Sequence, residues 1–181
     1  MRAALDLFAE RGYENTTVAE IAERAGLTKT TFFRHFPDKR EVLSAGQDTH
    51  ARLLADGVAG APAGAAPLEA VAAALDALTA TFTEGQREFG PRLLAVVVSN
   101  SELRERAVFK RAGLAAAITD ALRKRDVAEP AAGLAAELGV RAFHEAFRRW
   151  VEPANQRTFT ELAREELDEL RAAAAALGAG A

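Results

Sequence analysis

Apolar residues recur every three or four positions along most of this chain, which is the spacing of helices with one buried face. Near the N-terminus the pattern predicts a helix that ends at Gly12. Between Gly57 and Pro67 the chain is too rich in glycine and proline to continue a helix, so we expect a loop there. Beyond this loop the spacing predicts further helices over about 68–82, 88–99, 101–125, 130–152 and 155–177. The pattern therefore predicts an all-α protein.

The stretch from Thr17 to Phe36 predicts two short helices joined by a tight turn. Thr17 and Glu20 have the spacing of a capping box, in which each side chain satisfies a backbone N–H of the other residue. Gly26 permits the positive φ that ends the first helix, and Thr28 can cap the second. This arrangement is the sequence form of a helix-turn-helix, whose second helix enters the major groove of DNA.

A third, longer helix is expected after Pro37, which lacks a backbone N–H and so stops the helix before it. Asp38 can cap the new helix, and Glu41 completes a second capping box. The apolar face continues to about Val58. We expect this helix to connect the helix-turn-helix with the rest of the chain, so that a tilt at one end moves the other.

Charge is distributed unevenly along the chain. The formal net charge of −3 and the pI of about 5.7 argue against non-specific coating of nucleic acid. Between Lys29 and Arg40, however, four cationic residues and one acidic residue leave a local charge of +3. Such a group can be an ordinary solvated charge cluster. Beside a helix-turn-helix it favours a protein that engages phosphate at one surface only.

The residue types in the chain exclude several kinds of chemistry. There is no cysteine, which excludes disulfides, thiolate catalysis and cysteine-based zinc sites. The three histidines, His35, His50 and His144, are too scattered to suggest a metal cluster. Acidic residues in 102–105 and 161–169 alternate with arginines, which is typical of exposed helix faces and not of an acid/base pair. We therefore expect no metal, no cofactor and no enzymatic activity.

Membrane association is not expected either. No apolar run approaches the ~20 residues that a membrane-spanning helix needs. The first residues predict an amphipathic helix and not a signal peptide. We expect a cytoplasmic protein.

A resemblance to the DNA-binding region of TetR-type transcriptional regulators covers Met1–Leu43. It is carried by T-V-A-E-I-A-E-R-A-G-L-T-K-T-T-F-F-R-H-F, by A-A-L-D-L-F-A-E-R-G-Y-E-N-T-T before it and by F-P-D-K-R-E-V-L after it. The resemblance implies a three-helix DNA-binding domain over residues 1–43. Residues 44–181 would then form a helical bundle for ligand sensing and dimerisation. In the family, the first helix usually begins several residues earlier and carries a basic arm.

The resemblance and the positions of side chains suggest which residues contact DNA. The candidates for base contacts in the major groove are Lys29, Thr30, Thr31 and Arg34, because cations can donate to guanine and threonine can contact thymine. The candidates for the DNA backbone are Thr17, Phe33, His35 and Lys39, together with the cap Thr28. Most family members carry tyrosine in place of Phe33. Phe33 lacks the hydroxyl that would bond a phosphate, so the expected contact is packing against sugars. We expect Lys39→Ala to weaken binding to all DNA sequences equally and to flatten its salt dependence.

The resemblance also implies an effector pocket between the helices of the C-terminal part. Residues that could line it are Phe82, Phe89, Leu93, Val97, Phe109, Ile118, Phe143 and Phe147. Plain core is the favoured alternative for each of them, since any helical bundle needs apolar residues at this spacing. A mainly apolar small molecule is the expected effector, and its chemical class cannot be read from the sequence.

The last two long helices are the expected dimer surface. Paired with their two-fold mates they can form a four-helix bundle that buries Phe147, Trp150, Leu162 or Leu170. The alternative is that this face packs within the monomer. A dimer has two helix-turn-helix domains, which suits a DNA operator with repeated half-sites.

These observations favour a homodimeric repressor that binds double-stranded operator DNA and is released by a small-molecule effector. Activation of transcription instead of repression also remains open. The alternative from another class is a helical interaction or structural protein whose helix-turn-helix no longer binds DNA.

Overall fold

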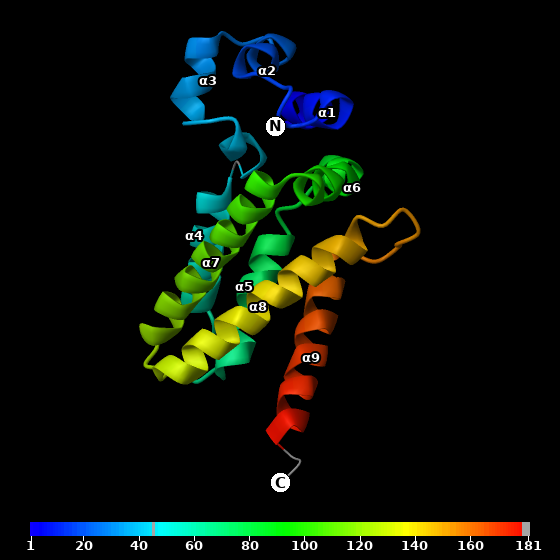
Figure 1. The fold of residues 1–181 in the computed structure, drawn as a ribbon. Coiled ribbons are helices and arrows are strands. Elements are labelled where there is room, and N and C mark those ends of the chain that lie inside the picture. Colours follow the sequence, from blue (N-terminus) through cyan, green and yellow to red (C-terminus); the bar gives the residue numbers. More distant parts are fainter. Residues whose placement is uncertain (45, 179–181) are drawn as a thin grey trace. The chain divides into compact units, whose positions relative to one another are not determined.

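The computed structural model describes residues 1–44 and 46–178, and every regular element in these ranges is a helix, which confirms the expected all-α class (Figure 1). The short elements are α1 (Arg2–Arg11), α2 (Val18–Arg24), α3 (Lys29–His35) and a 3₁₀ helix, η1 (Arg40–Ser44). The longer helices are α4 (Gln47–Ala59), α5 (Pro67–Thr79), α6 (Glu84–Ser99), α7 (Ser101–Arg123), α8 (Glu129–Trp150) and α9 (Phe159–Gly178).

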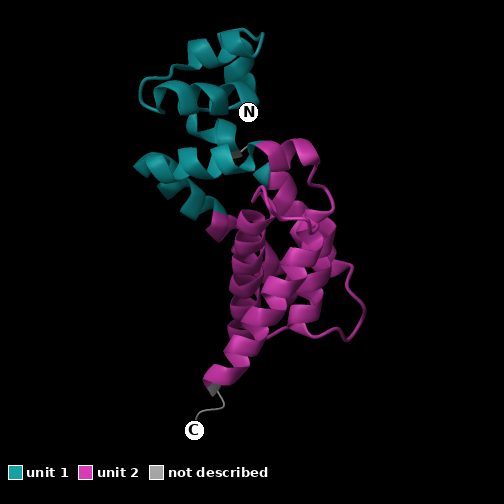
Figure 2. Cartoon of the chain, turned by 90° about the vertical axis from the view of Figure 1, so that its right-hand side faces the viewer, with its two compact units in different colours: residues 1–47, 89–110 teal, residues 48–88, 111–181 magenta. Residues whose placement is uncertain are grey.

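The chain divides into two compact units (Figure 2). Unit 1 comprises Met1–Gln47 and Phe89–Lys110, and unit 2 comprises Asp48–Glu88 and Arg111–Ala181. From the sequence, we expected the N-terminal domain to comprise residues 1–43 alone. Unit 1 additionally contains the end of α6 and the start of α7, so it is discontinuous in sequence.

The third helix expected after Pro37 is divided. The Asp38 carboxylate accepts hydrogen bonds from the backbone N–H groups of Arg40 and Glu41, at 2.8 and 3.2 Å, so it does cap an element. That element is the short η1, and α4 begins only after Gly46, whose φ is +88°. Residue 45, between them, lies outside the described residues. The prediction of one continuous helix is wrong, because the left-handed backbone of Gly46 cannot continue a right-handed helix.

The core of unit 1 forms where α1, α2 and α3 pack together. Phe8, Ile21 and Phe32, one from each helix, are at most 3% exposed. Val96 of α6 and Leu103 of α7 are buried in the same cluster. Removal of these apolar side chains from water is the main force that holds the three short helices in place.

Polar side chains add links within unit 1. Tyr13 donates a hydrogen bond to the Glu102 carboxylate at 3.0 Å, and burial together with this bond raises the pKa of Tyr13 above its ordinary value. Asn100 donates to Glu14 at 2.9 Å. Ion pairs also join Asp6 to Arg92, and Glu41 to Arg106 and Lys110. These links connect the N-terminal helices to α6 and α7.

Unit 2 is built on close contacts between α4, α5, α8 and α9. At Gly57 of α4, an added Cβ would lie 2.5 Å from the Cα of Ala74 in α5. At Gly139 of α8, an added Cβ would overlap the side chain of Val71 in α5. The two glycines therefore permit helix approaches that any larger residue would prevent.

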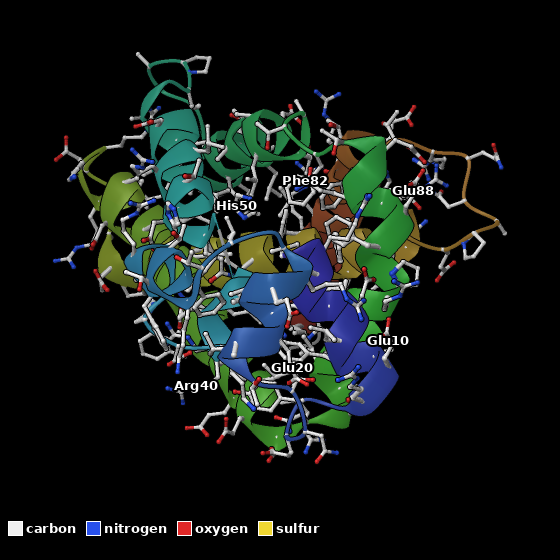
Figure 3. All side chains as sticks on the ribbon, turned by 90° about the horizontal axis from the view of Figure 1, so that it is seen from above. Glu10, Glu20, Arg40, His50, Phe82 and Glu88 are labelled. Carbon is white, nitrogen blue, oxygen red and sulfur yellow. The ribbon has the colours of Figure 1, made fainter. Side chains whose placement is uncertain are left out.

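An aromatic cluster occupies one end of unit 2. Its rings belong to Phe82, Phe143, Phe147, Trp150 and Phe159, and neighbouring ring centroids are 5.0 to 6.2 Å apart. The imidazole of His50 lies 5.3 Å from the ring of Phe82 (Figure 3). Burial lowers the pKa of His50.

Candidate nucleic-acid interface

The helix-turn-helix begins with the capping box expected at Thr17. The Thr17 hydroxyl accepts a hydrogen bond from the Glu20 backbone N–H at 3.3 Å, and the Glu20 carboxylate accepts one from the Thr17 N–H at 2.8 Å. Arg11 pairs with the same carboxylate at 2.8 Å. The bonds from Thr17 are the main reason that the pKa of Glu20 is lowered. They hold the Glu20 carboxylate against the start of α2.

The turn between α2 and α3 has the predicted glycine. Gly26 has a φ of +68°, and the Leu27 N–H donates to the Ala22 carbonyl at 2.8 Å, which closes α2. Thr28 then caps α3, because its hydroxyl accepts from the Thr31 N–H at 3.1 Å. The three local signals in the sequence are therefore confirmed.

One face of α3 is buried and the other is open. Phe32 is 2% exposed, and its ring packs against Phe36 with centroids 5.3 Å apart. The other faces of the helix carry Thr31, which is half-buried, and five exposed side chains: Lys29, Thr30, Phe33, Arg34 and His35. Across residues 1–44 and 46–178, no side-chain hydrogen bond or ion pair is formed by Lys29, Thr30, Arg34 or His35. The helix thus offers donors that have no partner inside the described protein.

Phe33 and the two capping threonines take different positions at this face. Phe33 is 47% exposed. Its ring packs edge-on against that of Phe32, with the two ring centroids 5.5 Å apart. Thr17 and Thr28 are exposed, but their hydroxyls are already engaged with Glu20 and Thr31. A hydroxyl has one proton to donate, and that of Thr17 is already given to Glu20. Thr28 can donate to a phosphate oxygen only while the Thr31 hydroxyl donates to it.

Lys39 differs from the other candidates. Its ammonium donates to the carbonyl oxygens of Tyr13 at 2.8 Å and of Thr16 at 3.2 Å. It also lies 4.0 Å from the centroid of the Tyr13 ring. Its assignment to the DNA backbone stays a prediction, and its observed partners belong to the protein.

The residues expected to line an effector pocket fall in both units. Phe89 and Leu93 pack against the core of unit 1, and Val97 is half-buried there. Phe109, also in unit 1, is 65% exposed, with the Arg106 guanidinium carbon 4.9 Å from its ring centroid. The candidates that unit 2 contains are Phe82, Ile118, Phe143 and Phe147. Of these, Ile118 is fully buried in the core.

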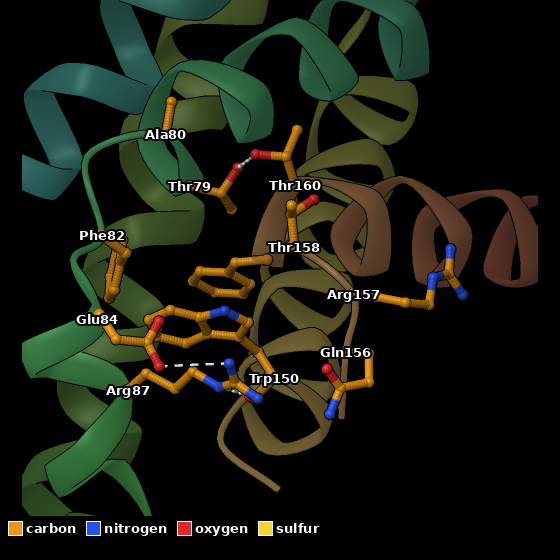
Figure 4. A pocket seen from close by; sticks show the side chains of 11 residues that line it. Thr79, Ala80, Phe82, Glu84, Arg87, Trp150, Gln156, Arg157, Thr158 and Thr160 are labelled. Atoms are coloured by element: carbon orange, nitrogen blue, oxygen red, sulfur yellow. Dashed lines mark hydrogen bonds and ion pairs between the residues drawn. The ribbon is translucent and has the colours of Figure 1, made fainter. Parts of the chain in front are cut away.

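A pocket of about 330 Å³ opens beside the aromatic cluster (Figure 4). The stacked rings of Trp150 and Phe159 line it, with centroids 5.0 Å apart and planes 12° from parallel. Phe82 lines it too. The pocket also has polar residues that sequence reasoning missed, namely Arg87, Gln156 and Arg157. Gln156 and Arg157 lie between α8 and α9, where no periodic signal exists, and Arg87 lies on α6 at a position that the apolar spacing does not mark.

The cations of this pocket are already occupied. Arg87 donates to the Trp150 carbonyl at 3.0 Å and also to the Asn155 carbonyl, and Arg157 pairs with Glu165. The pocket therefore offers aromatic faces and neutral polar groups more than free positive charge.

Two residues assigned to the dimer surface lie in the monomer core. Trp150 is 6% exposed and Leu162 is 1% exposed within a single chain. Their assignment to a dimer surface stays a prediction, and within the single chain α8 and α9 already bury them in unit 2. Phe147 and Leu170 are half-buried and stay candidates for that surface.

Two other findings concern possible partners. Within residues 1–44 and 46–178, no helix has both the length and the apolar character needed to cross a membrane. In the same ranges, no three acidic or histidine side chains lie close enough together to bind a metal ion.

Known proteins resemble the N-terminal part of the chain in sequence. Residues 1–45 match the family described as bacterial regulatory proteins, tetR family. The chain is 38% identical over 88 residues to the HTH-type transcriptional regulator TcmR of Streptomyces glaucescens, which covers 49% of this chain and 39% of TcmR. It is 39% identical over 56 residues to the HTH-type transcriptional activator FasR of Mycolicibacterium smegmatis, which covers 31% of this chain and 26% of FasR. The matches thus span less than half of each relative.

Solved structures resemble nearly the whole chain in fold. FadR from Bacillus subtilis, solved in complex with stearoyl-CoA, has a TM-score of 0.56 and 20% identity, over 92% of this chain and 93% of FadR. GusR from Salmonella enterica also has a TM-score of 0.56 and 20% identity, over 93% of this chain and 91% of GusR. At this identity the likeness concerns the fold alone.

Proposed function

We propose that this protein, whose N-terminal region belongs to the TetR family of bacterial regulatory proteins, binds operator DNA through α3 and regulates transcription. The observation that carries the proposal is the exposed face of α3. Lys29, Thr30 and Arg34 point donors outward, and no described part of the chain satisfies them. A rigid helix with such groups at its start suits the major groove, where cations and hydroxyls contact base edges.

An electrophoretic mobility assay with the upstream intergenic DNA tests this function. Wild-type protein should shift that duplex at low salt and should resist competition by unrelated DNA. A matched pair of variants separates the two kinds of contact. Thr30→Ala should change which operator is preferred, whereas His35→Ala should weaken binding to all sequences alike. Failure of the wild-type protein to shift any duplex would favour the alternative, a helical interaction protein that no longer binds DNA.

Dimerisation is part of the proposal, because an operator with two half-sites needs two reading heads. The half-buried Phe147 and Leu170, on α8 and α9, are the side chains of the predicted surface that a second copy could still cover. Leu170→Glu should shift the protein towards monomer in analytical ultracentrifugation. Leu177→Glu, at an 89% exposed position of α9, is the matched control.

We further propose that a mainly apolar small molecule releases the protein from DNA. The support is the aromatic cluster of unit 2, where Phe82, Phe143 and Phe147 come together. Fluorescence of Trp150, the single tryptophan, can report binding because its indole lies 6.0 Å from Phe82 between ring centroids. Decanoate and stearoyl-CoA, the second being the ligand in the FadR complex, are suitable first probes.

The sign of regulation is testable separately. We propose repression, and the similarity to the activator FasR makes the opposite sign the natural second outcome. A reporter behind the upstream intergenic DNA should be expressed more strongly when the gene is deleted. Lower expression after deletion would identify an activator instead.

A further inference from the structure

Lys39 lies between two connections that are far apart in the sequence. It stands in the short segment that leaves α3 and enters η1. The carbonyls that accept its hydrogen bonds, those of Tyr13 and Thr16, stand in the connection from α1 to α2. The ammonium therefore joins the start of the helix-turn-helix to its end.

The site that holds the ammonium is well formed. Thr16 and Tyr13 are 1% and 5% exposed, so their backbone is largely shielded from water. The Tyr13 carbonyl also accepts from the Thr16 N–H at 3.2 Å, and the Thr16 hydroxyl donates to the Gly12 carbonyl at 2.8 Å. The Tyr13 ring supplies a third attraction through its face, 4.0 Å away. A compact ammonium with three N–H groups suits this arrangement better than the planar fork of arginine.

We propose that Lys39 is a positioning residue that fixes the geometry of the DNA-reading head, and not a phosphate contact. The inference rests on the proposed DNA-binding function. Thr16, one of its partners, directly precedes Thr17, the cap of α2 and a candidate for the DNA backbone. By tying this point to the exit from α3, Lys39 sets the direction in which α2 and α3 face the duplex.

Lys39→Met tests the proposal against Lys29→Met, a matched change at an exposed lysine. Loss of Lys39 leaves the shielded Thr16 carbonyl without its donor, so the thermal midpoint of the free protein should fall by about 2 to 6 °C. The amides of Thr16 and Thr17 should exchange hydrogen faster. DNA affinity should fall while the salt slope stays that of the wild type. Lys29→Met, at a candidate base contact, should instead keep the midpoint and change which operator is preferred.

A Lys39→Met protein with unchanged midpoint and amide exchange, but with a salt slope reduced by about one unit, would overturn the proposal. Lys39→Arg gives a second reading if Lys39→Met does not fold. Since arginine keeps the charge but not the fit, the positioning role predicts a lowered midpoint, and a phosphate contact predicts wild-type stability and affinity. If wild-type protein binds no duplex, the proposed function fails, while midpoint and exchange still decide the role of Lys39.

Discussion

The cations of α3 and the arginines of unit 2 differ in what they bond to. Arg164 donates two hydrogen bonds to Asp76, both at 2.7 Å, and Arg125 donates to the carbonyls of Ala61 and Pro62 at 2.9 and 2.7 Å. On α3, the side chains of Lys29 and Arg34 reach no acceptor in residues 1–44 and 46–178. Exposure alone does not separate the groups, since the Arg164 side chain is 61% exposed.

The difference shows which cations serve the fold and which are available to another molecule. A cation that already has a carboxylate or carbonyl partner would lose that bond on turning to a phosphate. A cation without a carboxylate or carbonyl partner loses only its hydrogen bonds to water when it binds a phosphate. Changes in unit 2 should therefore act on stability, and changes on α3 should act on DNA binding.

The largest effect is expected in acid, from unit 2. Burial, with a smaller contribution from nearby Arg111, lowers the pKa of His144 to about 4. Because this lies below the ordinary value, the unfolded chain takes up a proton first as pH falls. Stability should decrease between pH of about 6.5 and about 4, by roughly 3 kcal/mol in total. Urea unfolding across this range measures it.

His144→Gln is the control for the acid effect, because it removes the titrating group. Its stability should depend less on pH, with the remaining slope partly due to His50, whose pKa burial also lowers. Equal slopes for the variant and the wild type would contradict the assignment to His144.

The next effect concerns the close approach of α4 and α5. Gly57→Ala should destabilise the protein by about 2 kcal/mol, because the clash with the Ala74 backbone outweighs the better helix propensity of alanine. Gly133→Ala, where an added Cβ meets nothing within 4 Å, should stabilise it by about 0.5 to 1 kcal/mol. Thermal unfolding of both variants checks this pair, and a stable Gly57→Ala protein would show that the helices can separate freely.

A smaller effect separates the two groups of cations directly. Arg34→Ala should weaken operator binding about tenfold while changing the free energy of unfolding by less than about 0.5 kcal/mol. Arg164→Ala should do the reverse, with lower stability and unchanged operator affinity. Fluorescence anisotropy with labelled duplex and urea unfolding give the two readouts. If both variants changed operator affinity, or both changed the free energy of unfolding, the proposed difference between the two groups of cations would be contradicted.

The smallest effect is a gain. Phe33→Tyr adds a hydroxyl at a 47% exposed ring and should tighten binding by a few-fold, about 0.5 to 1 kcal/mol. Phe33→Leu is the control without a hydroxyl. Unchanged affinity in Phe33→Tyr would place the ring away from the phosphates.

Local signals in the sequence predicted the helix-turn-helix well. The caps at Thr17 and Thr28 and the turn at Gly26 each depend on residues within about four positions of each other, so their spacing carries the information. The break at Gly46 was missed because the apolar period of α4 continues across it, and periodicity says nothing about φ.

Packing partners were predicted less well than helices. The spacing that marked Trp150 and Leu162 as a dimer surface is the same spacing that buries them in a monomer core, so sequence could not distinguish these roles. Phe89 and Phe143 looked alike as pocket residues, yet they belong to different units. The pocket residue Arg157 lies between two helices and gave no periodic signal, and Arg87 is a polar residue of α6 that the apolar spacing does not mark.

The sequence by itself determined the helical class, the capped helix-turn-helix and the residues that α3 exposes, since all of these follow from bonds between near neighbours. Only the tertiary structure decided that Phe89–Lys110 joins the N-terminal unit, and that the Lys39 ammonium bonds to Tyr13 and Thr16. Such contacts join positions more than twenty residues apart. They depend on how complete helices pack, which no short stretch of sequence specifies.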